Sequence, residues 1–316
     1  MERKSLRELV AQKQIFAPIV WDVMSAKCAE IAGFEATLLS GGVVAGNCAT
    51  PDVGLITADD LVRITGNVCS ASPLPCCIDA DDGYGETPLH AYRTTKRLAD
   101  AGAMALTLDD TTGTRGYGRW AKALRDGDPF GTIPHPAVSR DVFLAKTRAA
   151  LDACSGSECM LIARTETALQ YGLEEAIERC IRAEELGAEM TLVIGLRTLE
   201  EGTEVAKHVK GWKMWPDVMA PGGVPDVNFE DIEKLGFNYV TAHCITKGAS
   251  YGMTSWGKRV LEDKSTVFHD EHDMGITEEE AAHLDMFQMA HDKQWFDREA
   301  KYWKGLEHPY LGKIEG

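Results

Sequence analysis

In the segment Cys76 to Gly85, "CCIDADDGYG", a short apolar run leads directly into three aspartates and a Gly-Tyr-Gly turn. Carboxylates this close together repel one another unless a cation lies among them. One interpretation is a solvated acidic turn. The other is half of a divalent-metal site at the end of a buried strand, and the rest of the chain decides between them.

The pattern of an apolar run followed by a helical segment recurs along the chain. The predicted strands are 16–21, 36–41, 75–81, 104–110, 160–165, 190–195, 217–221 and 239–243. The predicted helices between them are 25–32, 57–71, 88–101, 139–153, 173–186, 198–208 and 228–235. Eight strands separated by helices favour an α/β fold of the (β/α)8 TIM-barrel type over a doubly wound open sheet.

The chain is expected to divide into a catalytic barrel, residues 1–254, and a C-terminal helical extension, residues 255–316. The extension is polar and helical in pattern, clearest over 278–303. Leu284, Phe287 and Trp295 fall on one predicted face, which is typical of packing against the barrel or a neighbouring subunit.

Composition limits the function classes. Of the 316 residues, 44% are apolar, enough for a buried core, and the formal net charge is -16. That charge argues against nucleic-acid and membrane-surface partners, which need a basic face. No apolar stretch approaches the roughly 20 residues of a membrane-spanning helix, and the first residues lack an apolar signal core. The nine cysteines form no C-x-x-C pair, so a reducing cytoplasm is expected.

Three aspartates fall where strands end. Asp79 and Asp81 are two residues apart on one strand and so face the same way, and Asp109 ends the next strand. The C-terminal ends of barrel strands build the active site. Three oxygen ligands without a nearby His or Cys cluster suit Mg2+ or Mn2+ rather than zinc.

Other strand ends carry groups with two interpretations each. Arg164, beside Glu166, is either part of a salt-bridged barrel interior or a fork for a substrate carboxylate. The segment "LSGG", ending in Ser40, Gly41 and Gly42, is either a turn or a set of backbone amides facing an anion. Taken alone, His243 is typical of a structural histidine and Asp52 of a solvated turn. The long segment 111–136 predicts a lid over the site.

Taken together, these segments resemble the isocitrate lyase/phosphoenolpyruvate mutase superfamily over residues 10 to 250. "WDVMSAKCAEIAGFEATLLSGG" resembles its opening strand–helix–strand with a Ser-Gly substrate loop. "DADDGYG" is similar to its D-A-D-x-G-Y-G metal segment, "LTLDDT" to its I-E-D segment and "IARTE" to its A-R-T-D segment. "TPDVG" resembles a loop that carries an aspartate near the metal.

The resemblance implies roles for these residues. Asp79, Asp81 and Asp109 would bind Mg2+ or Mn2+, mostly through water. Substrate contacts would come from Trp21, Asp22, Ser40, Gly41, Gly42, Arg164 and Glu166, and catalytic roles from Arg164, His243 and Asp52. The family's last helices swap between subunits, which implies a homo-oligomer, a dimer of dimers.

Two departures from the family pattern bear on the activity. Aspartate at Asp109 stands where the family has glutamate, and no cysteine occurs between Cys77 and Cys154, so the lid lacks the acid of the family's C–C lyases. "ALTLDDT", "LVIGLR" and the histidine after strand eight resemble the oxaloacetate decarboxylase branch. The expected activity is therefore a metal-dependent lyase that converts oxaloacetate to pyruvate and CO2.

Three alternatives to this activity stay open. The first is retro-aldol cleavage of 2-methylisocitrate or dimethylmalate, and the second is C–P bond chemistry of the phosphonopyruvate type. The third is a catalytically weak metal-binding barrel retained for binding or assembly.

Overall fold

A computed structural model describes residues 5–112, 136–196, 198–218, 227–265, 277, 279, 292–310 and 312–313. Eight parallel strands close into a barrel in the order β1 to β8, with β1 paired to β8. The strands are β1 (Ile15–Val20), β2 (Thr37–Leu39), β3 (Cys76–Asp79), β4 (Ala105–Leu108), β5 (Met160–Thr165), β6 (Met190–Val193), β7 (Trp212–Trp215) and β8 (Tyr239–Ala242). The (β/α)8 TIM-barrel prediction is confirmed.

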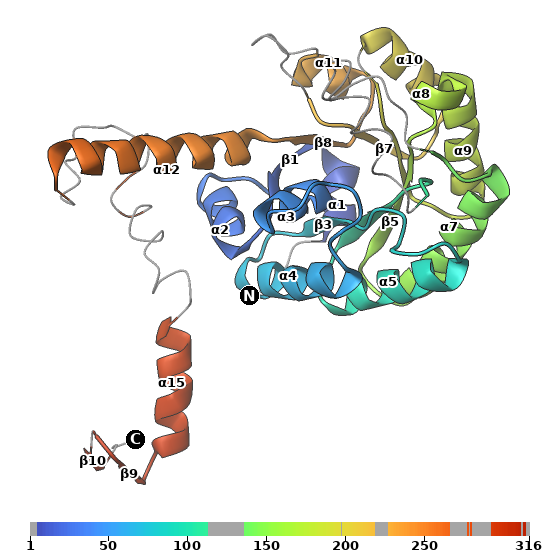
Figure 1. The fold of residues 1–316 in the computed structure, drawn as a ribbon. Helices are drawn as coiled ribbons and strands as arrows, with labels where there is room; N and C mark the ends of the chain where they lie inside the picture. The colour runs from blue at the N-terminus through green and yellow to red at the C-terminus, as the bar shows by residue number, and fades with distance from the viewer. Residues whose placement is uncertain are drawn as a thin grey trace. The chain divides into compact units, whose positions relative to one another are not determined.

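Helices surround the strands (Figure 1). They are α1 (Leu6–Gln12), α2 (Val23–Ile31), α3 (Gly41–Asn47), α4 (Ala58–Ala71), α5 (Pro88–Asp100), α7 (Arg140–Cys154), α8 (Ala168–Tyr171), α9 (Leu173–Glu185), α10 (Leu199–His208) and α11 (Phe229–Lys234). Several begin at the residues that the sequence favours as caps. Thr57 accepts a hydrogen bond from the Asp60 amide at the start of α4, and Thr198 does the same for Glu201 in α10.

One strand was predicted wrongly. The seventh strand is Trp212–Trp215 and lies ahead of Pro216, not at 217–221. Lys213 interrupts the apolar pattern there, yet its side chain is buried and Nζ donates to the Gly211 carbonyl at 2.9 Å. Burial lowers the pKa of Lys213. A charged residue therefore breaks the apolar pattern of this strand, although its side chain is buried and hydrogen-bonded to the backbone.

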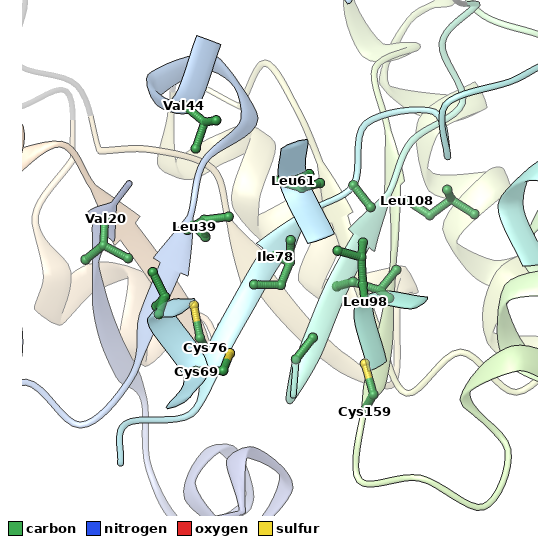
Figure 2. Close-up of a cluster of buried hydrophobic side chains, with 14 of the residues drawn as sticks. Val20, Leu39, Val44, Leu61, Cys69, Cys76, Ile78, Leu98, Leu108 and Cys159 are labelled. Atoms are coloured by element: carbon green, nitrogen blue, oxygen red, sulfur yellow. The ribbon is translucent and has the colours of Figure 1, made fainter. Parts of the chain in front are cut away.

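Alternate residues of each strand face opposite ways. One apolar cluster fills the barrel and includes Ala17, Cys77, Ile162 and Tyr239. A second lies between the strands and the helices on one side, and Figure 2 shows Ile78, Leu61 and Leu98 in it. Cys76 and Ile78 thus face the helices while Cys77 faces the barrel interior, so Asp79, of the same parity as Cys77, belongs to the inward row.

By internal contacts the chain divides into two compact units, Met1–Thr254 and Ser255–Gly316. Helix α12 (Cys244–Asp263) spans the division, and the second unit contains α15 (Asp292–Trp303) and the short strands β9 (Glu307–His308) and β10 (Gly312–Lys313). None of the helices in the described ranges is long and apolar enough to cross a membrane. Leu284 and Phe287 of the predicted packing face lie outside the described residues.

Candidate active site

On four strands, the side chains that face the barrel interior are followed, two residues at a time, by candidate site residues. Met160 and Ile162 of β5 belong to the interior cluster, so Arg164 follows them on the same side. The same alternation carries Ala105 to Asp109 on β4 and Tyr239 to His243 after β8. The strand ends of the barrel therefore converge on one face, which is where TIM-barrel active sites lie.

Arg164 is held between two carboxylates. Its Nη1 lies 3.0 Å from Asp79 Oδ1, and its Nε lies 3.0 Å from Glu166 Oε1. A further ion pair joins Nη2 to Glu166. Asp79 Oδ1 also accepts a hydrogen bond from Thr107 Oγ1 at 3.1 Å. The predicted Arg164–Glu166 pair is thus present, and both interpretations of Arg164 remain compatible with a guanidinium that links two strand ends.

Asp81 follows β3 in an unusual backbone conformation. Its φ is +49°, and Gly83 and Tyr84 follow at +84° and +57°. Left-handed conformations cost an ordinary residue about 1–2 kcal/mol each, so the surroundings must hold this turn in place. One such contact is the Asp109 amide, which donates to the Asp81 carbonyl at 2.8 Å. Strain of this kind concentrates at functional sites.

Gly41 lies against both Asp79 and Asp81. A Cβ at this position would be 3.4 Å from each Asp81 carboxylate oxygen and 3.6 Å from Asp79 Oδ2. A Cβ at Gly42 would be 2.9 Å from Asp52 Oδ2. The start of α3 therefore brings three predicted carboxylates, from two separate segments of the chain, to one glycine pair. Ser40 caps this helix and accepts from the Val43 amide at 3.4 Å.

Asp109 is fully buried, and its Oδ1 accepts from the amide and the hydroxyl of Thr111 at 2.9 and 2.6 Å. The neighbouring Asp110 faces the other way and binds Arg179 Nη1 at 3.1 Å. Burial, opposed by hydrogen bonds from Thr165 and Glu166 and by Arg179, raises the pKa of Asp110 to about 6. Because Asp110 Oδ1 also accepts from the Glu166 amide at 2.9 Å, it fixes the backbone beside Arg164.

Trp21 and Asp22 have a structural part in the fold. Asp22 is the N-cap of α2, where its Oδ1 accepts from the Ser25 amide at 2.7 Å. The Trp21 amide donates to Ser25 Oγ at 3.0 Å, and its ring packs on the core between strands and helices. Their predicted substrate contacts stay a prediction.

His243 has a partner, Asp217, that the sequence patterns do not indicate. Its Nδ1 lies 3.0 Å from Asp217 Oδ2, and Asp217 Oδ1 accepts from Thr241 Oγ1 at 2.7 Å. Burial lowers the pKa of His243, but the hydrogen bond and charge of Asp217 outweigh it and raise the pKa above its ordinary value. Burial raises the pKa of Asp217, but His243, Thr241 and Arg164 lower it overall.

The sequence does not point to Asp217, because the apolar pattern predicts a strand over 217–221 and places this residue at its start. Once β7 ends at Trp215, Asp217 becomes a polar residue just past a strand end, like Asp79 and Arg164. Thr107 was also missed, although its place two residues before Asp109 on the inward row would have identified it.

Among the residues that the structure describes, no three His, Cys, Asp or Glu side chains form a group that could hold a metal ion directly. Asp79 and Asp81 nonetheless share the space beside Gly41, and Asp109 joins the same turn through its amide. Carboxylate oxygens around such a space fit a hard divalent cation bound through its water shell, as Mg2+ usually is.

The lid is predicted over 111–136, and residues 113–135 of it lie outside the described residues. Its two ends lie together, because the Thr112 amide donates to the Pro136 carbonyl at 2.9 Å and the Val138 amide to the Asp110 carbonyl at 2.8 Å. A cavity of about 470 Å³ adjoins the site, lined by Asp81, Asp82, Tyr84, Thr57 and Arg93 among others.

The model of the phosphoenolpyruvate phosphomutase family matches residues 6–253. A 2-methylisocitrate lyase from Aeropyrum pernix is 31% identical over 83% of this chain and 80% of its own length. An oxaloacetate decarboxylase from Pseudomonas fluorescens is 32% identical over 66% of this chain and 67% of its own length.

Solved structures agree on the fold. A 2,3-dimethylmalate lyase superposes with a TM-score of 0.74 and 25% identity, covering 94% of this chain and 97% of that one. An oxaloacetate acetylhydrolase in complex with 3,3-difluorooxalacetate gives a TM-score of 0.76 and 25% identity, covering 94% of this chain and 96% of that one.

Proposed function

Because the chain belongs to the phosphoenolpyruvate phosphomutase family and is a lyase, we propose that it cleaves a carbon–carbon bond of a small 2-oxo or 2-hydroxy dicarboxylic acid. The leading reaction is the decarboxylation of oxaloacetate to pyruvate and CO2. The observation that carries this choice is the His243–Asp217 pair, a candidate proton donor whose carboxylate feels the charge of Arg164.

Asp79, Asp81 and Asp109 would hold Mg2+ or Mn2+, mostly through water. The bound cation would polarise the 2-oxo group and stabilise negative charge on its oxygen. The two glycines beside these carboxylates leave room for the cation and the substrate, since a side chain at Gly41 would lie 3.4 Å from Asp81. Asp52, beside Gly42, would orient water or substrate at the same place.

Arg164 would bind the substrate carboxylate next to the 2-oxo group. A planar guanidinium offers two parallel donors to a carboxylate, and its contacts with Asp79 and Glu166 fix its orientation in advance. Ser40 and the amides of Gly41 and Gly42 would complete the binding of this anionic end. Trp21 and Asp22 would line the pocket.

His243 would supply the proton. When the C3–C4 bond breaks, its electron pair stays with the three-carbon fragment and CO2 leaves without needing an acid. Protonation at C3 then gives pyruvate. Since Nδ1 is bonded to Asp217, Nε2 is the ring nitrogen that would donate, and the raised pKa increases the protonated fraction near neutral pH. The imidazole is 38% exposed, so solvent can return the proton.

Retro-aldol cleavage is the second candidate, favoured by the similarity to 2-methylisocitrate lyase over most of the chain. In that reaction the electron pair of the broken bond leaves with the departing fragment, which must be protonated, and the lid segment contains no cysteine to supply that proton. Decarboxylation also needs one proton, but it goes to C3 of the retained fragment, and the departing CO2 needs none. C–P chemistry of the phosphonopyruvate type remains a third candidate, and a catalytically weak metal-binding barrel a fourth.

A substrate panel tests these assignments. Purified protein with Mg2+ or Mn2+ is supplied with oxaloacetate, 2-methylisocitrate, 2,3-dimethylmalate and phosphonopyruvate, and the 2-oxo acid products are measured against a metal-only blank. Turnover of oxaloacetate above the blank supports the decarboxylase. Cleavage of a hydroxy acid alone supports the retro-aldol reaction, and inactivity on all four supports the weak barrel.

The oligomeric state and the cellular location can also be inferred. We infer a homo-oligomer, a dimer of dimers in which the segment 255–316 packs on a neighbouring subunit, and a cytoplasmic location. The exposed Trp295 and Phe296 of α15 support the first, because side chains of this size are seldom left in water. The nine cysteines, all free thiols, support the second.

A further inference from the structure

Lys146 of α7 is a buried lysine that no part of the proposed chemistry uses. Its side chain is 1% exposed. Nζ donates to the Gly85 carbonyl at 3.1 Å and lies 3.8 Å from Asp82 Oδ2. Both acceptors belong to the turn of residues 81–85, which begins at the candidate metal ligand Asp81. An ammonium group is almost never buried without such partners.

The turn depends on contacts of this kind. Asp81, Gly83 and Tyr84 all have positive φ, so the turn does not hold its shape through local preference alone. Inside the turn, the Tyr84 amide donates to Asp82 Oδ1 at 2.9 Å. From α5, Thr94 Oγ1 donates to the Gly83 carbonyl at 2.9 Å. Lys146 adds an external attachment at Asp82 and Gly85, which follow Asp81 in the turn.

We propose that Lys146 is a positioning residue for the divalent-metal site: by holding Asp82 and the Gly85 carbonyl, it fixes the strained turn that presents the Asp81 carboxylate. The inference depends on the proposed function, because it assigns Lys146 to the same site. A buried residue that orients a metal ligand commonly changes metal affinity 10- to 100-fold when it is removed.

A simpler role would be charge compensation, in which Lys146 only neutralises the buried Asp82. The two roles differ in one variant. Lys146→Met combined with Asp82→Asn removes both charges, while the side-chain carboxamide introduced by Asp82→Asn keeps an oxygen for the Tyr84 amide. Charge compensation would then be unnecessary, but the attachment to Gly85 would still be lost.

The test compares wild type, Lys146→Met, the double variant and Lys96→Met, a control at an exposed lysine of α5 that pairs with Asp100. Mn2+ affinity is measured on substrate-free protein by electron paramagnetic resonance of the unbound ion. Hydrogen exchange of the amides of residues 81–85 is measured on metal-free protein, and thermal unfolding on all four.

Both Lys146 variants are expected to bind Mn2+ about tenfold more weakly and to exchange the amides of this turn faster, with Lys96→Met unchanged. The double variant should recover thermal stability without recovering Mn2+ affinity. If the double variant recovered both Mn2+ affinity and slow exchange of the amides of residues 81–85, the positioning role of Lys146 would be wrong. Failure of the wild type to bind Mn2+ would overturn the proposed metal site, and the assignment of Lys146 with it.

Discussion

Arg164 is the residue that connects the carboxylates after β3 and β5 with the His243–Asp217 pair. It binds Asp79 and Glu166 directly, and its charge lowers the pKa of Asp217, the partner of His243. Its planar fork holds both carboxylates in fixed directions and, in the proposed reaction, would hold a substrate anion as well, which the single ammonium group of lysine would not do.

Arg164→Lys is therefore expected to raise KM for the 2-oxo acid about tenfold or more, through loss of a charge-assisted hydrogen bond. Steady-state kinetics at saturating Mg2+ measures it. Arg182→Lys, at an exposed arginine of α9 that pairs with Glu178 and Glu185, is the matched control and should leave KM unchanged. Equal KM values in both variants would remove Arg164 from substrate binding.

The His243–Asp217 pair predicts a pH dependence. Activity that needs a protonated imidazole falls as pH rises through the raised pKa of His243. Asp217→Asn removes the charge that raises this pKa and leaves the burial that lowers it, so the alkaline fall in kcat/KM should move to lower pH. An unchanged pH profile would show that another group donates the proton.

The same pair contributes to stability with a defined sign. The raised pKa means that the contribution is fully present below the unfolded pKa of about 6.5 and is lost as pH rises through the folded value. His243→Gln should therefore lower the melting temperature more at pH 5.5 than at pH 8.5. Calorimetry at the two pH values checks this, and an equal loss at both would contradict it.

Helix α3 contains one glycine that contacts a candidate site residue and another that has open space around it. A methyl group at Gly42 would lie 2.9 Å from Asp52 Oδ2, whereas one at Gly46 meets no atom within 4 Å. Gly42→Ala should displace Asp52 and lower kcat, while Gly46→Ala should keep activity and stabilise the protein by about 0.5–1 kcal/mol. Kinetics and thermal unfolding of the two variants separate the effects, and equal kcat would exclude a role for Asp52.

The sequence predicts helices and strands correctly where the spacing of apolar residues and the capping residues indicate the same element. Residues 160–165 were predicted as a strand and form β5 with the same bounds, and Thr57 and Thr198 mark the helix starts predicted near them. Prediction failed where tertiary contacts compensate for poor local signals. Lys213 concealed β7, and Gly41, Gly42 and Gly46 gave α3 too little helix propensity to be recognised.

The candidate site was likewise predictable where local sequence signals suffice and not where tertiary contacts are needed. Strand-end positions and the family resemblance point to Asp79, Asp81, Asp109, Arg164 and His243 as candidates, but the prediction that Asp81 shares a strand with Asp79 is wrong, because β3 ends at Asp79. Asp217 depended on the correct end of β7, and the contact between Lys146 and the turn of residues 81–85 joins positions far apart in the sequence. No spacing rule could have found a pairing of that kind, because only the packing of α7 creates it.

The whole molecule is proposed to assemble into a dimer of dimers. Trp295 and Phe296 of α15 are 61% and 68% exposed in the single chain. If this helix covers a neighbouring subunit, light scattering should give a mass four times the 34.6 kDa of one chain. Trp295→Ser with Phe296→Ser should lower that mass, whereas the control Lys293→Ser should not. A wild-type monomer would contradict the proposed assembly.

Pyruvate formation from oxaloacetate with Mg2+, corrected for the metal-only rate, tests whether Asp79 and Asp81 form a metal-dependent lyase site. The wild-type rate should exceed the blank, vanish with a chelator and return with Mg2+, while folded Asp81→Asn should lose at least roughly 100-fold, a few kcal/mol of transition-state stabilisation. A chelator-insensitive rate, or equal rates in wild type and Asp81→Asn, would exclude a metal-dependent site at these aspartates.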